Sequence, residues 1–205
     1  MLLVMTLNSL LYYFLPLYFL LFGVTFFWHS LMVWKKTGVN PYVLHKAEGA
    51  QELVARLFRP LGGLLVIIVG SFLYLPGLYA FFCPIAALDH GVIKLISLAL
   101  LVLALLWVFL AQSQMGNSWR VGIDDENHTG LVSHGLFKLS RNPVFLGVRF
   151  FLLGIFLLLP SLTMLFFVLF VELLVQLQVR FEEEYLFGLH GERYREYCSR
   201  VKRWL

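Results

Sequence analysis

The chain has 205 residues, of which 60% are hydrophobic, 17% aromatic and only 14% charged, and its formal net charge is +4. Ordinary globular proteins carry about a quarter charged residues, so a chain this apolar cannot cover a water-facing surface and much of it must face lipid. The composition excludes a disordered chain, a disulfide scaffold and a nucleic-acid-binding module. Cys83 and Cys198 form no metal-binding or redox motif.

Five apolar segments are predicted to cross the membrane. A spanning helix needs about 20 mostly apolar residues, because about 30 Å of hydrocarbon is crossed at about 1.5 Å per residue. The last apolar block, residues 144–179, is too long for one crossing, and Pro160 near its middle predicts a tight helical hairpin with slightly short arms. The predicted spans are Leu10–Trp34, Leu61–Cys83, Val92–Ala111, Val144–Leu159 and Ser161–Val179.

Basic residues predict the orientation of these spans. Fourteen of the 16 Lys and Arg residues lie in the first loop with Lys35 and Lys36 at its start, in the polar segment Gln112–Asn142 or in the tail after Val179. The positive-inside rule makes this side cytoplasmic, with the amino terminus outside and the carboxyl terminus inside. The first residues, MLLVMTLNS, lack the basic region of a cleaved signal peptide.

The three cytoplasmic segments differ in character. Thr37–Pro60 has mixed charge and is predicted to be a short amphipathic or irregular connector. Gln112–Asn142 is polar and rich in glycine, and a loop of about 30 residues in so compact a protein is usually functional. The tail is expected to form one or two interfacial helices broken near Gly188 or Gly191. The chain is thus divided into 1–111, three spans with a basic loop, and 112–205, the functional core.

Two motifs flank the predicted hairpin. Ser140–Gly147 reads SRNPVFLG and resembles the R-[HN]-P-x-[YF]-x-G signature of integral membrane methyltransferases. Met115–Ile123, MGNSWRVGI, resembles the segment that precedes this signature in many small bacterial members. The second motif follows about 35 residues later in the order and spacing of the same family. It comprises Glu182-Glu183, Gly191, Tyr194, Tyr197 and the basic, aromatic end Val201-Lys202-Arg203-Trp204.

The closest resemblance is to the isoprenylcysteine carboxyl methyltransferase family, with phospholipid methyltransferases as cousins, and it covers roughly Met115–Leu205. The resemblance implies that S-adenosylmethionine binds at the cytoplasmic end of the last helices without a Rossmann domain, and the chain indeed has no G-x-G-x-x-G after a strand. No metal is implied. The residues expected to hold the cofactor are His134, Gly135, Leu136, Arg141, Asn142, Pro143, Phe145, Gly147, Glu182, Glu183, Tyr194 and Tyr197.

Each of these residue types also has a simpler interpretation. Arg141 would serve equally as a helix-end anchor to lipid phosphates and Asn142 as a helix cap. The two glutamates would serve as solvated charges on an interfacial helix, and the sequence does not decide which of them has the larger role. The tyrosines would serve as packing residues. His128 and His134 are candidate general bases or ordinary loop residues.

Two charges lie inside the predicted hairpin. Arg149 stands 11 residues before Pro160 and Glu172 stands 12 after it, so antiparallel arms place both about 17 Å from the turn. An unpaired charge at this depth costs at least about 2.5 kcal/mol, which predicts that the two side chains meet. Glu172, Gln176, Arg180 and Glu183 then form one helical stripe. Arg141, Arg149 and Glu172 are the candidate catalytic residues, although the pair would also serve to hold the hairpin together.

The sequence therefore predicts an all-α integral membrane methyltransferase that acts on a lipophilic or prenylated acceptor, with carboxyl O-methylation of the isoprenylcysteine type as the first hypothesis. A carboxylate is already ionised at pH 7 and needs no base, whereas an amine must lose a proton. The alternatives are a phospholipid ethanolamine N-methyltransferase, a sterol-reductase-like protein and a non-enzymatic transporter or assembly protein. The expected partners are the bilayer and the acceptor, with no nucleic acid and no metal.

Overall fold

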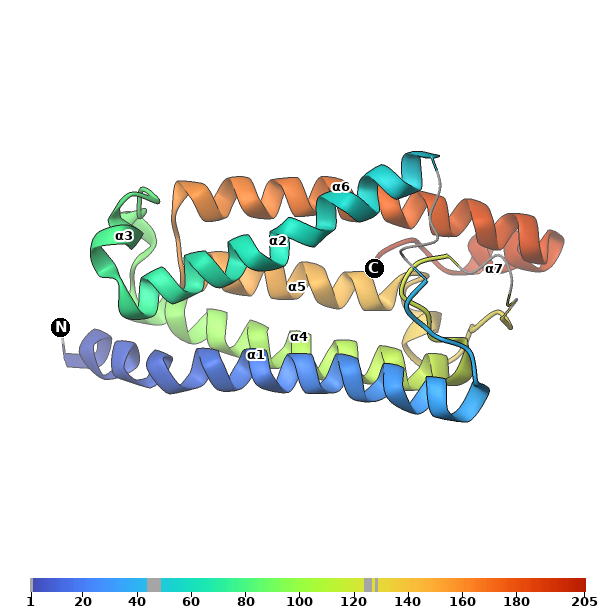
Figure 1. The fold of residues 1–205 in the computed structure, drawn as a ribbon, viewed down its shortest axis with the longest axis horizontal. Helices are drawn as coiled ribbons and strands as arrows, with labels where there is room; N and C mark the ends of the chain where they lie inside the picture. The colour runs from blue at the N-terminus through green and yellow to red at the C-terminus, as the bar shows by residue number, and fades with distance from the viewer. Residues whose placement is uncertain (1, 44–48, 124–126, 128) are drawn as a thin grey trace.

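The computed structural model describes residues 2–43, 49–123, 127 and 129–205, and within them the chain is helical with no strand. Figure 1 shows an elongated bundle whose long helices run along its length. The long helices are α1 (Leu2–Thr37), α2 (Gly49–Tyr74), α4 (Gly91–Met115), α5 (Pro143–Leu158) and α6 (Leu162–His190). The shorter helices are α3 (Pro76–Ala80), η2 (Ala86–Leu88), η3 (Gly116–Ser118), η4 (Gly135–Lys138) and α7 (Glu192–Arg200).

Four helices among the described residues, α1, α2, α4 and α6, are long and apolar enough to cross a membrane. The fifth predicted span corresponds to α5, which has 16 residues and is therefore about 24 Å long. The structure thus confirms an all-helical protein with several candidate spans. The crossing by α5 and the orientation of the termini stay predictions.

Helix α4 packs most extensively against α5, and two glycines allow this close approach. A Cβ at Gly147 would lie 2.6 Å from Val108 Cγ2, and one at Gly154 would lie 3.1 Å from Leu101. Small residues let helix backbones come together in this way in membrane proteins. The indole of Trp107 also donates a hydrogen bond to the Pro143 carbonyl at 3.0 Å, which fixes the start of α5 against α4.

The second helix differs from the prediction at both ends. It begins at Gly49, so half of the predicted connector Thr37–Pro60 is helical, and it ends at Tyr74 before the predicted limit of Cys83. The end is explained by Leu75, which precedes Pro76 and has φ −134°, because a residue before proline is driven out of the α conformation. The following segment binds the α5–α6 turn, where Ile85 N–H donates to the Pro160 carbonyl at 2.8 Å.

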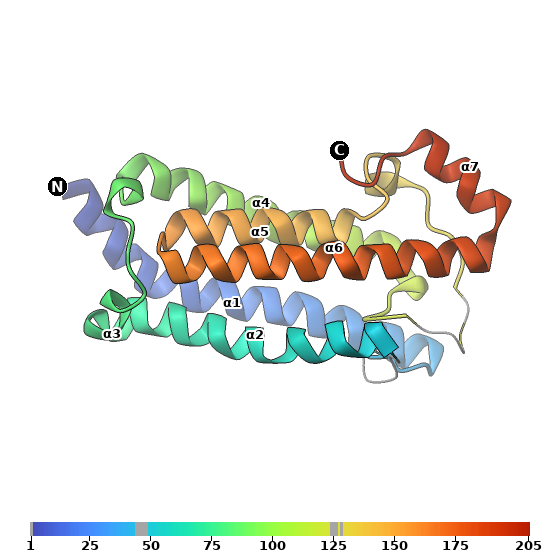
Figure 2. The ribbon, with the colours of Figure 1, turned by 90° about the horizontal axis from the view of Figure 1, so that it is seen from above.

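The end of the chain folds back onto the bundle. Ser161 caps α6 by accepting a hydrogen bond from Met164 N–H, and α6 continues well beyond the predicted limit of Val179. The helix ends at Gly191, where φ is +52°, a conformation that glycine adopts without strain. Figure 2 shows α7 turning away from the end of α6 and the last residues returning toward α5. The predicted break at Gly191 is confirmed, and Gly188 lies within α6.

Candidate active site

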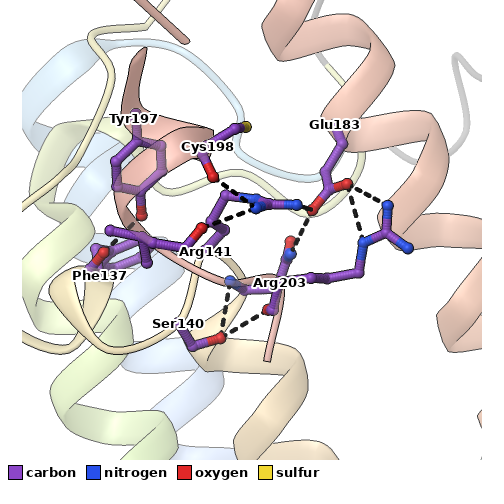
Figure 3. Close-up of polar contacts among 9 residues, drawn as sticks. Phe137, Ser140, Arg141, Glu183, Tyr197, Cys198 and Arg203 are labelled. Carbon is purple, nitrogen blue, oxygen red and sulfur yellow. Dashed lines mark hydrogen bonds and ion pairs between the residues drawn. The ribbon is translucent and has the colours of Figure 1, made fainter. Parts of the chain in front are cut away.

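Glu183 is the centre of a polar cluster that joins three parts of the chain (Figure 3). Its Oε1 accepts hydrogen bonds from Arg141 Nη2 at 3.0 Å, Arg141 Nε at 3.2 Å and Asn142 Nδ2 at 3.1 Å. Its Oε2 accepts from Arg203 Nη2 at 2.6 Å and Arg203 Nε at 3.0 Å. The Glu183 side chain is only 13% exposed, so a largely buried carboxylate is shared between two guanidinium groups. We call these four residues the Glu183 clamp.

Backbone contacts complete the clamp. Arg141 donates from its backbone N–H to the Lys202 carbonyl at 2.9 Å and from Nη1 to the Val201 carbonyl at 2.8 Å. Ser140 Oγ donates to the Arg203 carbonyl at 2.9 Å. The SRNP motif and the basic, aromatic end of the chain are therefore one packed unit. Most of the Arg141 donors are bound to protein atoms inside it.

The two tyrosines of the second motif are the buried residues of α7. Tyr197 OH donates to the Phe137 carbonyl at 2.6 Å, and burial raises the pKa of Tyr197 to about 12, so the phenol is a proton donor at neutral pH. Burial, with a further contribution from the Glu183 charge, also raises the pKa of Tyr194. The hydrogen bonds of Glu183 raise the pKa of Arg203 above its usual value. Both phenols therefore stay protonated, and Arg203 stays charged, across the physiological range.

A cavity of about 360 Å³ opens beside the clamp, within the range of about 300–1,000 Å³ typical of small-molecule sites. A smaller cavity of about 100 Å³ shares five of its lining residues with the larger one. The larger cavity is lined by Phe26, Phe58, Met115, Trp119, Arg120, Val121, Gly122, Phe137, Arg141, Asn142, Pro143, Val144, Phe145, Val148, Val175, Gln178, Glu182 and Leu186.

The wall of the cavity changes from apolar to polar along the bundle. Phe58, Val148 and Val175 line it deeper in the helices, whereas Arg120 and Glu182 line it at the end that carries the predicted cytoplasmic loops. Gln178 Nε2 donates to Glu182 Oε1 at 3.1 Å, and no other hydrogen bond to the Glu182 carboxylate comes from the described residues. The polar end of the cavity therefore presents a carboxylate with unused acceptor capacity.

The predicted cofactor residues separate into two groups. Arg141, Asn142, Pro143, Phe145 and Glu182 line the cavity. The structure places the others outside its wall: His134, Gly135, Leu136, Gly147, Glu183, Tyr194 and Tyr197.

Several members of the second group have an evident structural role. Gly147 packs against α4, and Gly135 has φ +59° in a turn that Gln114 Oε1 holds by accepting from Leu136 N–H at 2.7 Å. His128 lies outside the described residues.

The predicted approach of Arg149 and Glu172 is confirmed. Arg149 Nε lies 3.0 Å from Glu172 Oε2, and Gln176 Nε2 donates to Glu172 Oε1 at 2.6 Å. The Trp204 ring covers the Arg149 guanidinium with 4.4 Å between Cζ and the ring centroid. Neither charged residue lines the cavity. Their catalytic role stays a prediction.

Other residues of the site carried little or no signal in the sequence. Arg203 belongs to the basic, aromatic end, but nothing in its spacing indicates that it shares a carboxylate with Arg141. Gln178 reads as an ordinary helix residue. Phe26 comes from the first predicted span and Phe58 from the predicted connector Thr37–Pro60, and neither belongs to a motif. Among the described residues no cluster of His, Cys, Asp or Glu could hold a metal ion.

Residues 92–193, about half of the chain, match the family model described as phospholipid methyltransferase. The matched segment runs from the start of α4 into α7 and contains both the RNP motif and the Glu182-Glu183 pair. The match indicates an integral membrane methyltransferase of the superfamily that includes the isoprenylcysteine carboxyl methyltransferases. Comparison with curated proteins and with solved structures gave no match.

Proposed function

We propose that this protein is a membrane methyltransferase that binds S-adenosylmethionine in the cavity beside the Glu183 clamp and methylates a lipophilic acceptor. The observation that carries this proposal is the Glu182 carboxylate, which lines the polar end of a cavity whose deeper wall is aromatic and apolar. The family match supports the reaction class.

The cavity residues fit the chemical parts of the cofactor. Glu182 is suited to accept hydrogen bonds from ribose hydroxyls or from the amino group. Arg120, at the same end, offers positive charge to the carboxylate. The aromatic rings of Trp119, Phe137 and Phe145 offer surfaces for adenine and for a sulfonium, because cations are attracted to aromatic faces.

The chain's own residues supply binding, orientation and exclusion of water. When bound, S-adenosylmethionine supplies an electrophilic methyl group. The apolar wall formed by Phe58, Val148 and Val175 suits the tail of an acceptor that enters from the membrane, and it keeps water from the reacting groups. The polar end opens where the water-soluble cofactor arrives. Access from two sides is a physical reason to build such an enzyme from membrane helices.

Two acceptors are consistent with this site. A carboxylate of the isoprenylcysteine type is already ionised at neutral pH, and the described residues of the cavity wall include no paired acid and base. A phospholipid amine is favoured by the family whose model matches, and Glu182 would then be the group on the cavity wall able to take up its proton. The first acceptor remains our leading hypothesis, and the second is the alternative.

Transfer of a radiolabelled methyl group separates these acceptors. Purified protein in lipid nanodiscs would be given labelled S-adenosylmethionine with either a prenylated cysteine analogue or phosphatidylethanolamine. Base-labile label on the cysteine analogue would establish carboxyl methylation, and base-stable label on the lipid would establish amine methylation. Label on neither acceptor, nor on any lipid extracted from the source membrane, would contradict the proposed function.

A further inference from the structure

The Arg149–Glu172 ion pair joins α5 to α6 next to the returning tail, and neither residue lines the cavity. Arg149 and Glu172 remain 33% and 29% exposed although they lie within the predicted hairpin. Charged groups at such depth are costly unless polar partners surround them. The Arg149–Glu172 pair therefore leaves part of its hydrogen-bonding capacity open toward the surroundings of the protein.

The hydrogen-bonding groups that the pair leaves unused are donors of Arg149. Glu172 is engaged through both oxygens, Oε2 by Arg149 and Oε1 by Gln176. Arg149 uses Nε for this pair, and within the described residues its two Nη groups make no hydrogen bond. Trp204 covers one face of the guanidinium, which leaves its edge as the accessible part. A planar, bidentate donor of this kind suits phosphate or carboxylate.

The charge around this edge favours an anion. On the helical stripe, Glu172 is paired with Arg149, and Glu183 is paired with Arg141 and Arg203, whereas Arg180 has no ion-pair partner among the described residues. Arg180 lies between Gln176 and Glu183 on the helical stripe and is exposed. An anion bound at Arg149 therefore meets an excess of positive charge.

The short α5 brings lipid head groups toward this edge. At about 24 Å, α5 is about 6 Å shorter than the hydrocarbon core of a typical bilayer, and such a mismatch is met by local thinning. Arg149 lies six residues from the start of α5, about 9 Å along its axis. Trp204 and Arg149 are also the residue types that occupy membrane interfaces.

We propose that Arg149, beneath Trp204, binds the phosphate of an anionic membrane lipid on the outer face of α5 and α6, at a site separate from the cavity. The lipid phosphate accepts hydrogen bonds from the open Nη edge, and Arg180 strengthens its attraction. This site is independent of the proposed function, because neither Arg149 nor Arg180 lines the cavity.

Native mass spectrometry of the detergent-purified full chain tests the proposal with phosphatidylglycerol, phosphatidylcholine and inorganic phosphate as probes. The double variant Arg149→Ala/Glu172→Ala removes the pair without changing net charge or leaving one charge of the pair without the other. The matched control is Arg195→Ala/Glu192→Ala, which removes the exposed ion pair of α7 (64% and 80% exposed). We expect the first variant to bind phosphatidylglycerol about tenfold more weakly than wild type, and the control to match wild type.

Equal phosphatidylglycerol affinity in the two double variants would overturn the proposal. Inorganic phosphate binding as tightly as the lipid would also overturn it, because the site would then recognise a soluble anion. If the first variant fails to fold, Arg180→Ala provides the second test, since this exposed side chain has no hydrogen bond to a described residue. Wild-type affinity for phosphatidylglycerol in a folded Arg180→Ala variant would contradict the stated role of Arg180.

Discussion

Glu182 and Glu183 are consecutive residues with opposite surroundings. Successive side chains on a helix point about 100° apart, so one faces the cavity and the other faces the returning tail. Among the described residues, Glu183 accepts hydrogen bonds from three side chains, whereas Glu182 accepts one, from Gln178. Consecutive residues of one motif therefore have two different environments: one glutamate joins the tail to the helices, and the other lines the cavity.

The largest effect is expected on stability, for Glu183→Ala. This change leaves Arg141 and Arg203 facing each other without their shared carboxylate, and Arg141 is only 13% exposed. Loss of one partner from a buried ion pair costs about 3 kcal/mol or more. Thermal unfolding in detergent measures the loss. The matched control is Glu184→Ala, since Glu184 is exposed on the same turn. Equal melting temperatures for the two variants would show that the clamp does not stabilise the protein.

A smaller loss is expected for Arg203→Ala. Glu183 keeps Arg141 and Asn142, but it loses two hydrogen bonds from Arg203, whose side chain is 35% exposed. We expect a loss of about 2 kcal/mol, with partial recovery in Arg203→Lys because lysine keeps the charge without the planar fork. Unfolding measurements on both variants check this order. A loss for Arg203→Ala as large as that for Glu183→Ala would contradict the view that the carboxylate is the centre.

Tyr197→Phe is expected to have the smallest effect, because it removes one hydrogen bond, to the Phe137 carbonyl, and costs about 1 kcal/mol. The pH dependence of the stability that Tyr197 contributes is more informative than the size of the loss. The pKa of Tyr197 is about 12 in the folded protein, against about 10 when unfolded. The unfolded state therefore loses its proton first, and this contribution to stability is present below pH 10 and falls as the pH rises toward 12. Unfolding followed from pH 8 to 11 should show a shallower decline for Tyr197→Phe, and identical profiles would contradict this assignment.

The sequence predicted those features that depend on local chemistry or on the distance of a residue from the turn of the helical hairpin. Residue counts from Pro160 were enough to predict the contact of Arg149 with Glu172, because both helices rise equally per residue. Glycine predicted a break near Gly188 or Gly191, and the helix ends before Gly191. The early end of α2 was missed, although Leu75-Pro76 carries the signal, because the apolar run continues to Cys83. The early start at Gly49 was missed because that part of the helix is not apolar.

The different positions of Glu182 and Glu183 could not be predicted. Motif spacing places both glutamates at the end of the last long helix, but only the packing of the tail decides which of them is covered. Arg203 reaches Glu183 because the chain reverses at Gly191 and returns to α5, a long-range event with no local pattern. Phe26 and Phe58 meet the cavity through the packing of α1 and α2, which the sequence does not reveal.

The most direct test is calorimetric titration of S-adenosylhomocysteine into detergent-purified wild type and Glu182→Gln, with the melting temperature of each measured in parallel. We predict binding by wild type and a loss of at least about tenfold in affinity for Glu182→Gln, at an unchanged melting temperature, because Glu182 contacts the ligand and holds little of the fold. Equal affinity in both proteins, or no binding by a folded wild type, would contradict the assignment of this cavity to the cofactor.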